Sequence, residues 1–122
     1  MKSFDDMIFN LHPIALDSGR KAVDALLVPG EEVVAAFATV RDKMVFTDRR
    51  IIAVDIQGIG KKVSYCNLPY SRISSFCIET ADVLDLDSTL EITTPSGARS
   101  TFEFSGGFDI RGLCRAIAER IL

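Results

Sequence analysis

The chain has 122 residues, of which 48% are hydrophobic and 25% are charged, and its formal net charge is −3. This length suits one domain, and the composition is that of an ordinary globular protein, which excludes wholesale disorder. The acidic balance argues against nucleic acid as the main partner, because nucleic-acid-binding domains usually carry a basic excess.

The N-terminal segment, residues 1–28, differs in pattern from the rest. Its first apolar stretch is broken by Asn10, His12 and Pro13, which is typical of neither a signal peptide nor a membrane span. We therefore expect a cytoplasmic protein. The three cysteines (Cys66, Cys77, Cys114) form no CxxC pair, so we expect three buried free thiols in a reducing compartment.

A helix is expected at the end of this segment. Asp17 and Ser18 can cap it, and it would run to about Leu27, where Pro29 and Gly30 end it. Its apolar positions follow helical spacing: Ala22, Val23, Leu26 and Leu27. The sequence thus predicts a helical extension at 1–28, followed by a domain at 29–122.

Short strand-like runs separated by turn residues fill the middle of the chain. Seven are predicted, at Val33–Val40, Lys43–Thr47, Arg50–Ile56, Lys62–Asn67, Arg72–Thr80, Thr89–Thr94 and Arg99–Phe104. Seven strands at this spacing indicate a sandwich or a small barrel. The stretch "EEVVAAFATV" at 31–40 is rich enough in alanine to be helical by propensity, which leaves an alternative for the first strand.

Two of these strands are apolar on both faces. Around Phe37 and around Ile52, alternate positions are apolar rather than polar. A sheet that faces water on one side should instead show polar residues at every second position. Either the N-terminal helix or another subunit must therefore cover the outer face.

The last segment predicts an amphipathic helix. Asp109 can cap its N-terminus. One apolar stripe then follows at helical spacing: Ile110, Leu113, Cys114, Ile117 and Ile121. The strands are the large apolar surface against which this stripe can pack.

Several segments resemble a bacterial pleckstrin-homology-like family. "VRDKMVFTDRRIIAVDIQGIGKKVSY" at 40–65 is similar to its opening hairpins, "LPYSRISSFCIETA" at 68–81 to its fifth strand with the preceding turn, and "DLDSTLEI" at 85–92 to its sixth strand. The resemblance implies a seven-stranded antiparallel bent barrel, capped by the C-terminal helix. It also implies a small stand-alone protein without a cofactor, and a ring-shaped homo-oligomer for which a pentamer is one candidate size.

The basic residues at the predicted hairpin ends are candidates for ligand or interface contact: Arg41, Lys43, Arg49, Arg50, Lys61 and Lys62. Related eukaryotic domains bind phosphoinositides with cations near the first two strands. A phosphate site needs several converging donors, whereas a solvated turn explains each pair separately. We expect Thr47-Asp48-Arg49-Arg50 to be a hairpin turn in which Asp48 bonds backbone groups two residues on.

Other motifs do not complete a recognised site. "GIGKK" at 58–62 lacks the spacing of a P-loop, and Asp82, Asp85 and Asp87 lack the spacing of an EF-hand. His12 is the one histidine, so it offers no metal cluster, and a Ser–His or Cys–His pair would have to use it as the base. We therefore expect no catalytic, cofactor or metal residues, and no enzyme.

Charge is divided along the chain. Residues 41–62 carry six cations and three anions, whereas residues 79–91 carry five anions and no cation. This favours head-to-tail contact between subunits, which closes into a ring when the rotation permits, although chance asymmetry on solvated loops is an alternative. The sequence thus predicts a non-enzymatic binding and assembly module that recognises itself and a further protein. The alternative is a peripheral module that binds anionic lipid through the basic hairpin ends.

Overall fold

A computed structural model describes residues 4–57, 62–80 and 87–122. Within these residues lie eight strands: β1 (Ile8–Pro13), β2 (Val33–Ala38), β3 (Lys43–Thr47), β4 (Arg50–Gln57), β5 (Lys62–Pro69), β6 (Ser75–Glu79), β7 (Ser88–Thr93) and β8 (Arg99–Phe104). The helical elements are α1 (Leu16–Val23), the 3-10 turns η1 (Asp24–Leu26) and η2 (Tyr70–Arg72), and α2 (Ile110–Ile121).

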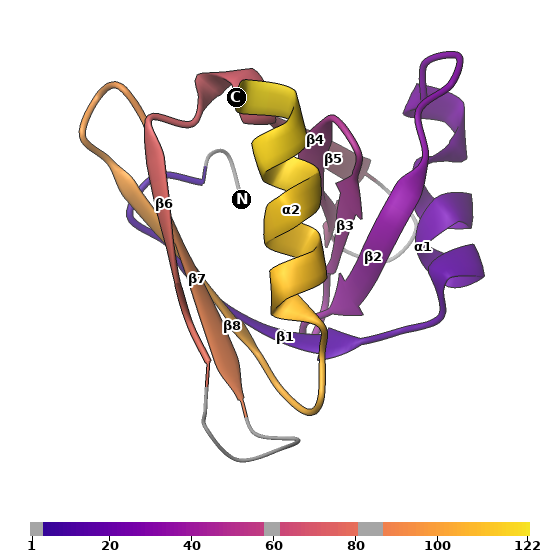
Figure 1. Cartoon of the computed structure of the whole chain (residues 1–122). Helices are drawn as coiled ribbons and strands as arrows, with labels where there is room; N and C mark the ends of the chain where they lie inside the picture. The colour runs from indigo at the N-terminus through magenta and orange to yellow at the C-terminus, as the bar shows by residue number, and fades with distance from the viewer. Residues whose placement is uncertain (1–3, 58–61, 81–86) are drawn as a thin grey trace.

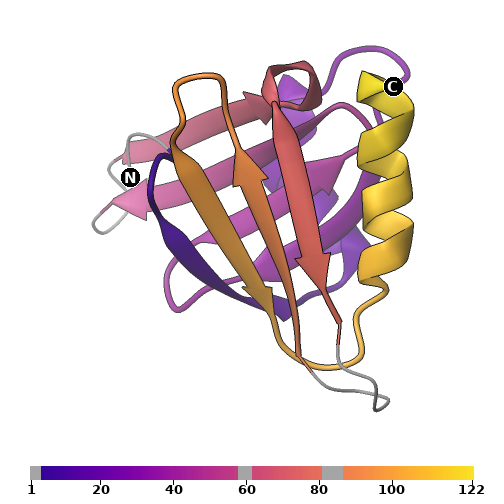
Figure 2. The ribbon, with the colours of Figure 1, turned by 60° about the vertical axis from the view of Figure 1, so that its left-hand side comes forward.

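The described strands form one curled sheet in the order β5-β4-β3-β2-β1-β8-β7-β6. Figure 1 shows its two layers, β2 to β5 on one side and β6 to β8 on the other, with α2 between them. Figure 2 shows that the strands of the two layers cross at an angle. The predicted fold class, a bent and partly open barrel with a C-terminal helix, is confirmed, with eight strands instead of seven.

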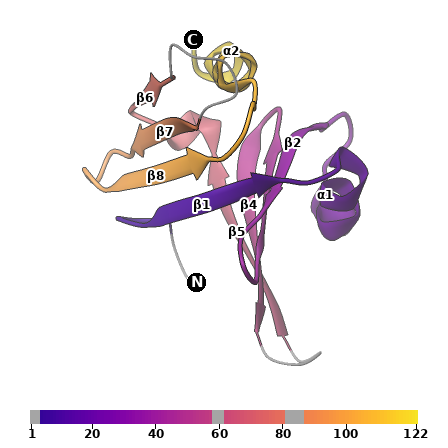
Figure 3. The ribbon, with the colours of Figure 1, turned by 90° about the horizontal axis from the view of Figure 1, so that it is seen from below.

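The additional strand, β1, is the main correction to the sequence analysis. It lies in the segment predicted as a helical extension and joins the two layers (Figure 3). It pairs in parallel with β8 over Ile8 to Leu11 and in antiparallel fashion with β2 at His12 and Pro13. Alternation explains it: Phe9 and Leu11 are buried whereas their neighbours are exposed. Six residues ending in proline gave too short a pattern to predict it.

The predicted N-terminal helix exists, but its start differs. α1 begins at Leu16 after Ala15, which makes no side-chain cap, so the predicted caps are wrong. Val23 of α1 is buried against Val45 and Ile52 on the outer face of the sheet. The helix therefore covers the strands that are apolar on both faces, and the Ala-rich stretch is a strand, β2.

Gly19 allows α1 to approach this closely. A Cβ at that position would collide with the Cβ of Ala36 on β2. The glycine therefore acts as a contact point between helix and sheet, because a larger side chain would push α1 away.

α2 follows the prediction. The Asp109 side chain accepts a hydrogen bond from the Gly112 amide at 3.0 Å, which caps the helix. The stripe of Ile110, Leu113, Cys114 and Ile117 is buried among the aromatic rings of the inner sheet face. In the part of the chain that the structure describes, no helix is long and apolar enough to span a membrane.

None of the three cysteines is in a disulfide bond, and they differ in burial. Cys114 is buried, which raises the pKa of its thiol to about 11. Cys66 is half-buried and Cys77 is exposed on β6, so the prediction of three buried thiols is wrong. Cys77 is exposed because strand alternation turns Phe76 and Ile78 towards the core and Cys77 to the outer face of β6.

Candidate functional site

The outer face of β1, β8 and β7 is the part of the described sheet that carries a polar groove. Strand alternation directs Phe102 and Phe104 to the core, and it directs Glu103 and Ser105 to the outer face. Asn10 lies opposite Glu103, which in turn lies opposite Thr89. α1 covers the outer face of the other layer (Figure 1), whereas Asn10 and Glu103 on this layer are exposed to solvent.

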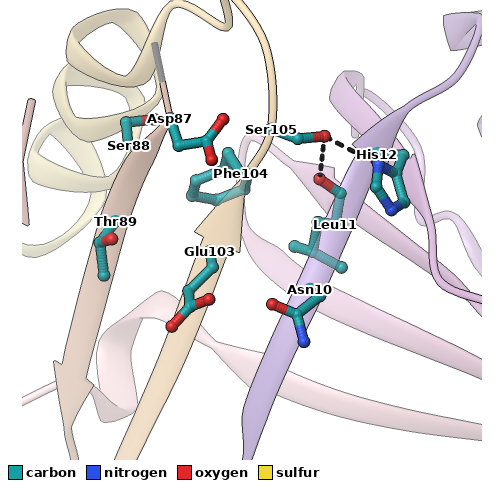
Figure 4. Close-up of a pocket in the computed structure, with 9 residues that line it drawn as sticks. All are labelled: Asn10, Leu11, His12, Asp87, Ser88, Thr89, Glu103, Phe104 and Ser105. Carbon is teal, nitrogen blue, oxygen red and sulfur yellow. Dashed lines mark hydrogen bonds between the residues drawn. The ribbon is translucent and has the colours of Figure 1, made fainter. Parts of the chain in front are cut away.

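The groove has a volume of about 340 Å³. Its lining residues come from three strands and their ends: Asn10, Leu11, His12, Asp87, Ser88, Thr89, Glu103, Phe104 and Ser105 (Figure 4). Leu11, Ser88 and Phe104 are buried and form the floor. The Ser88 side chain is buried on the inner side of β7, and its hydroxyl has no hydrogen-bond partner among the described residues.

His12 and Ser105 meet at one end of the groove. His12 Nδ1 lies 2.8 Å from Ser105 Oγ, and Ser105 Oγ donates to the Leu11 carbonyl at 3.3 Å (Figure 4). A hydroxyl carries one proton, so both contacts are satisfied when His12 Nδ1 holds a proton and donates it. The second ring nitrogen is then an acceptor. In this arrangement His12 does not take the proton of Ser105, as a catalytic base would.

Two carboxylates flank the groove. Asp87 Oδ1 accepts a hydrogen bond from the Gly106 amide at 3.3 Å. The Glu103 carboxylate makes no hydrogen bond or ion pair with any described residue. None of the described residues that line the groove is an arginine or lysine. Among the described residues no three His, Cys, Asp or Glu side chains are placed to hold a metal ion, so the groove is a polar surface rather than a metal centre.

The predicted contacts Arg41 and Lys43 lie in and beside the turn between β2 and β3. Thr39 Oγ1 accepts hydrogen bonds from the backbone amides of Arg41 and Asp42, which fixes this turn. Arg41 is exposed. Burial and a nearby carboxyl group, Asp55, raise the pKa of Asp42.

Arg49 and Arg50 lie at the turn between β3 and β4. Arg50 binds Glu31 through two hydrogen bonds of 2.9 Å, and its remaining donors reach the Leu26 carbonyl and Asn67. This guanidinium is therefore part of the fold rather than a ligand contact. The Nε of Arg49 is buried and has no hydrogen-bond partner in the structure.

The residue that stabilises this turn is Thr47, not Asp48. Thr47 Oγ1 accepts from the amides of Arg49 and Arg50 at 3.0 Å and donates to Glu31. Asp48 instead accepts from the Glu32 amide and from Arg120 of α2. The predicted role of Asp48 is wrong because threonine already occupies the position that caps the turn.

The basic hairpin ends do not all converge. Arg50 pairs with Pro69 at one end of β4, and Gln57 pairs with Lys62 at the other, about 23 Å away at 3.3 Å per residue. Lys61, Asp82 and Asp85 lie outside the described residues. Asp87 lies in the groove, which the sequence analysis did not predict, because its residues come from strands far apart in the chain.

The curled sheet with a helix across its open side defines a pleckstrin-homology-like fold. The family model of the bacterial PH domain matches residues 2–121, and the chain belongs to that family. It is similar to YjqA of Bacillus subtilis (strain 168), a protein described as uncharacterized. The two sequences are 44% identical over 93 residues, and this alignment covers 75% of this chain and 74% of YjqA.

Solved structures agree in fold. A protein of Shewanella loihica PV-4, described as a DUF1696 family protein with a pleckstrin-homology domain, has a TM-score of 0.72 and 33% identity, covering 93% of this chain and 99% of its own. A pleckstrin homology domain of Shewanella amazonensis SB2B has a TM-score of 0.60 and 35% identity, covering 89% and 90%. These comparisons indicate no enzymatic family.

Proposed function

We propose that this protein is a non-enzymatic binding and assembly module, which forms a cyclic homo-oligomer in the cytoplasm and recognises a further protein. The observation that carries the proposal is an exposed apolar patch on a terminal strand. Ile56, Val63 and Tyr65 are 42%, 49% and 39% exposed on the outer face of β4 and β5. Ile56 lies opposite Val63, so the three side chains form one surface.

This patch suits a second copy of the chain. β5 is at the end of the described sheet, and the backbone edge of a terminal strand can pair with another chain. The patch also continues the apolar cluster beneath α1, through Val54. An apolar surface beside an open strand edge favours subunit contact.

Native mass spectrometry tests the assembly. The wild type should appear as a multiple of the 13.4 kDa subunit, and Val63→Asp should reduce it to the monomer because a charge in the contact is costly. Ile8→Asp is the matched control, since Ile8 is 64% exposed and lies on β1, which is four strands away from β5 in the sheet order. A monomeric wild type would exclude assembly and with it the pentamer.

Electrostatic contact between head-to-tail subunits remains part of the proposal, with a revised test. Because Arg50 is bonded to Glu31, its reversal would disturb the fold. Arg41 and Lys62 are exposed cations of the same stretch. Reversing both to glutamate should weaken assembly, and an unchanged native mass would show that these charges do not contribute.

Lipid binding is the second candidate function. Val40 lies in the turn between β2 and β3 beside exposed Arg41, and Met7 and Ile8 border the same hollow of about 330 Å³. An exposed apolar side chain beside a cation is suited to an anionic membrane surface.

Sedimentation with vesicles separates this candidate from the first. Phosphatidylserine-containing vesicles should retain the protein at low salt and release it at high salt, whereas pure phosphatidylcholine should not bind it. Val40→Asp should abolish retention and Val63→Asp should not. Equal recovery with both vesicle types would exclude anionic-lipid binding.

A further inference from the structure

We infer that the groove on the outer face of β1, β8 and β7 binds an arginine side chain of a partner protein. The inference rests on the part of the proposed function in which the protein recognises another protein, and it is independent of the contact through β5. The first support is chemical. The groove presents the carboxylates of Asp87 and Glu103, the hydroxyl of Thr89 and the second ring nitrogen of His12.

These groups are mostly acceptors, and the described part of the lining contains no arginine or lysine. Glu103 has no ion-pair partner among the described residues, so its charge is available to an incoming cation. A guanidinium group has five N–H donors and no acceptor, and it binds carboxylates in a fixed geometry. The groove and an arginine side chain are therefore complementary in both charge and hydrogen bonding.

The spacing of the carboxylates supports arginine as the ligand. Thr89 lies opposite Glu103 and Ser88 opposite Phe104, so Asp87 is placed diagonally to Glu103 across two neighbouring strands. Diagonal neighbours in a sheet are about 7–8 Å apart, which leaves room for a planar group between the two carboxylates. The Asp87 carboxylate is held by the Gly106 amide, so one wall is already oriented.

The size of the groove is compatible with one long side chain. Pockets for small molecules and cofactors span about 300–1,000 Å³, and this groove of about 340 Å³ is at the lower limit. One long side chain fits that volume. The surrounding face adds Glu79 on the neighbouring strand β6, which favours a further cation in the segment that presents the arginine.

Nuclear magnetic resonance tests the inference with a defined probe. The capped peptide Gly-Gly-Arg-Gly-Gly is titrated into ¹⁵N-labelled protein, and the same peptide with citrulline, which is neutral, serves as the comparison. Arginine should shift the amide signals of Asn10, Thr89 and Ser105 selectively, and citrulline should not. Glu103→Gln should weaken binding about tenfold, as expected for a lost charge-assisted hydrogen bond.

Glu91→Gln is the matched control, because Glu91 is on the same sheet face but outside the groove, beside Arg99 at 3.9 Å. It should bind the arginine peptide as the wild type does. Equal weakening by Glu91→Gln, equal binding of citrulline or absence of localised shifts would overturn the inference. A reduced native mass of Glu103→Gln would also overturn it, because the groove would then be filled by a second copy. If the wild type is monomeric and still binds the peptide, the assembly proposal is excluded and the arginine groove stands.

Discussion

Glu31 shows how one residue can hold several elements together. Its side chain is fully buried and accepts from Arg50, Thr47 and the Val28 amide. Burial alone would raise the pKa of Glu31, but these hydrogen bonds outweigh it and lower the pKa to about 2. One carboxylate therefore connects the loop before β2 with the β3–β4 turn. It also reaches β5, because Arg50 donates a hydrogen bond to Asn67.

Replacing Glu31 with glutamine should destabilise the protein on the order of 3 kcal/mol at pH 7, because Arg50 loses its counter-ion in a partly buried site. Since the folded pKa is below the unfolded value, the stabilisation exists above about pH 4.5 and is lost as the pH falls towards 2. Urea unfolding of both proteins across this range measures it.

The control for Glu31 is Asp17→Asn, in an exposed pair with Lys21 on α1. Exposed pairs contribute little, so its unfolding curve should match that of the wild type. A difference between wild type and Glu31→Gln that stays constant from pH 7 to 2 would contradict the role of the charge.

At the scale of elements, α2 supplies the clearest test. Ile117 is fully buried on its apolar stripe. Ile117→Asp should cost about 4 kcal/mol or more, because an unpaired carboxylate would lie among the rings of the core. Arg115→Asp, on the exposed face, should melt close to the wild type. Equal melting temperatures in thermal unfolding would mean that α2 does not pack through this stripe.

How far an element could be predicted depended on the length and regularity of its pattern. α2 was predicted because twelve residues repeat one apolar period after a capping aspartate. β1 was missed because two buried positions, Phe9 and Leu11, are too few to distinguish a strand. The groove was missed for another reason: Asn10, Thr89 and Glu103 each resemble ordinary solvated strand residues, and only the strand order brings them together.

At the scale of the whole molecule, β1 makes the two layers one sheet. Its pairs with β2 and β8 connect strands that otherwise have no contact within the described sheet order. Removing residues 1–28 should therefore expose buried aromatic residues on the two strands that β1 joins, such as Phe37 on β2 and Phe102 on β8.

This deletion tests the predicted division at residue 28. The shortened chain should show poor dispersion in its amide spectrum and no cooperative thermal transition, because the core loses β1 and α1 together. Asp17→Asn, an exposed substitution within the deleted segment, serves as the control and should retain both properties. A well-dispersed spectrum from residues 29–122 would establish that the domain folds without the extension.

The pairing of β1 with β8 also has a consequence for how the chain is made. His12 and Ser105 are 93 positions apart, so a ribosome that has released β1 must still synthesise a long stretch of chain before β8 is available. Contacts of such sequence separation slow folding, because a long loop has to close before they form. Phe9 and Leu11 then remain accessible to chaperones or to a neighbouring nascent chain throughout synthesis. The strand that joins the two layers is thus synthesised well before one of its two partner strands.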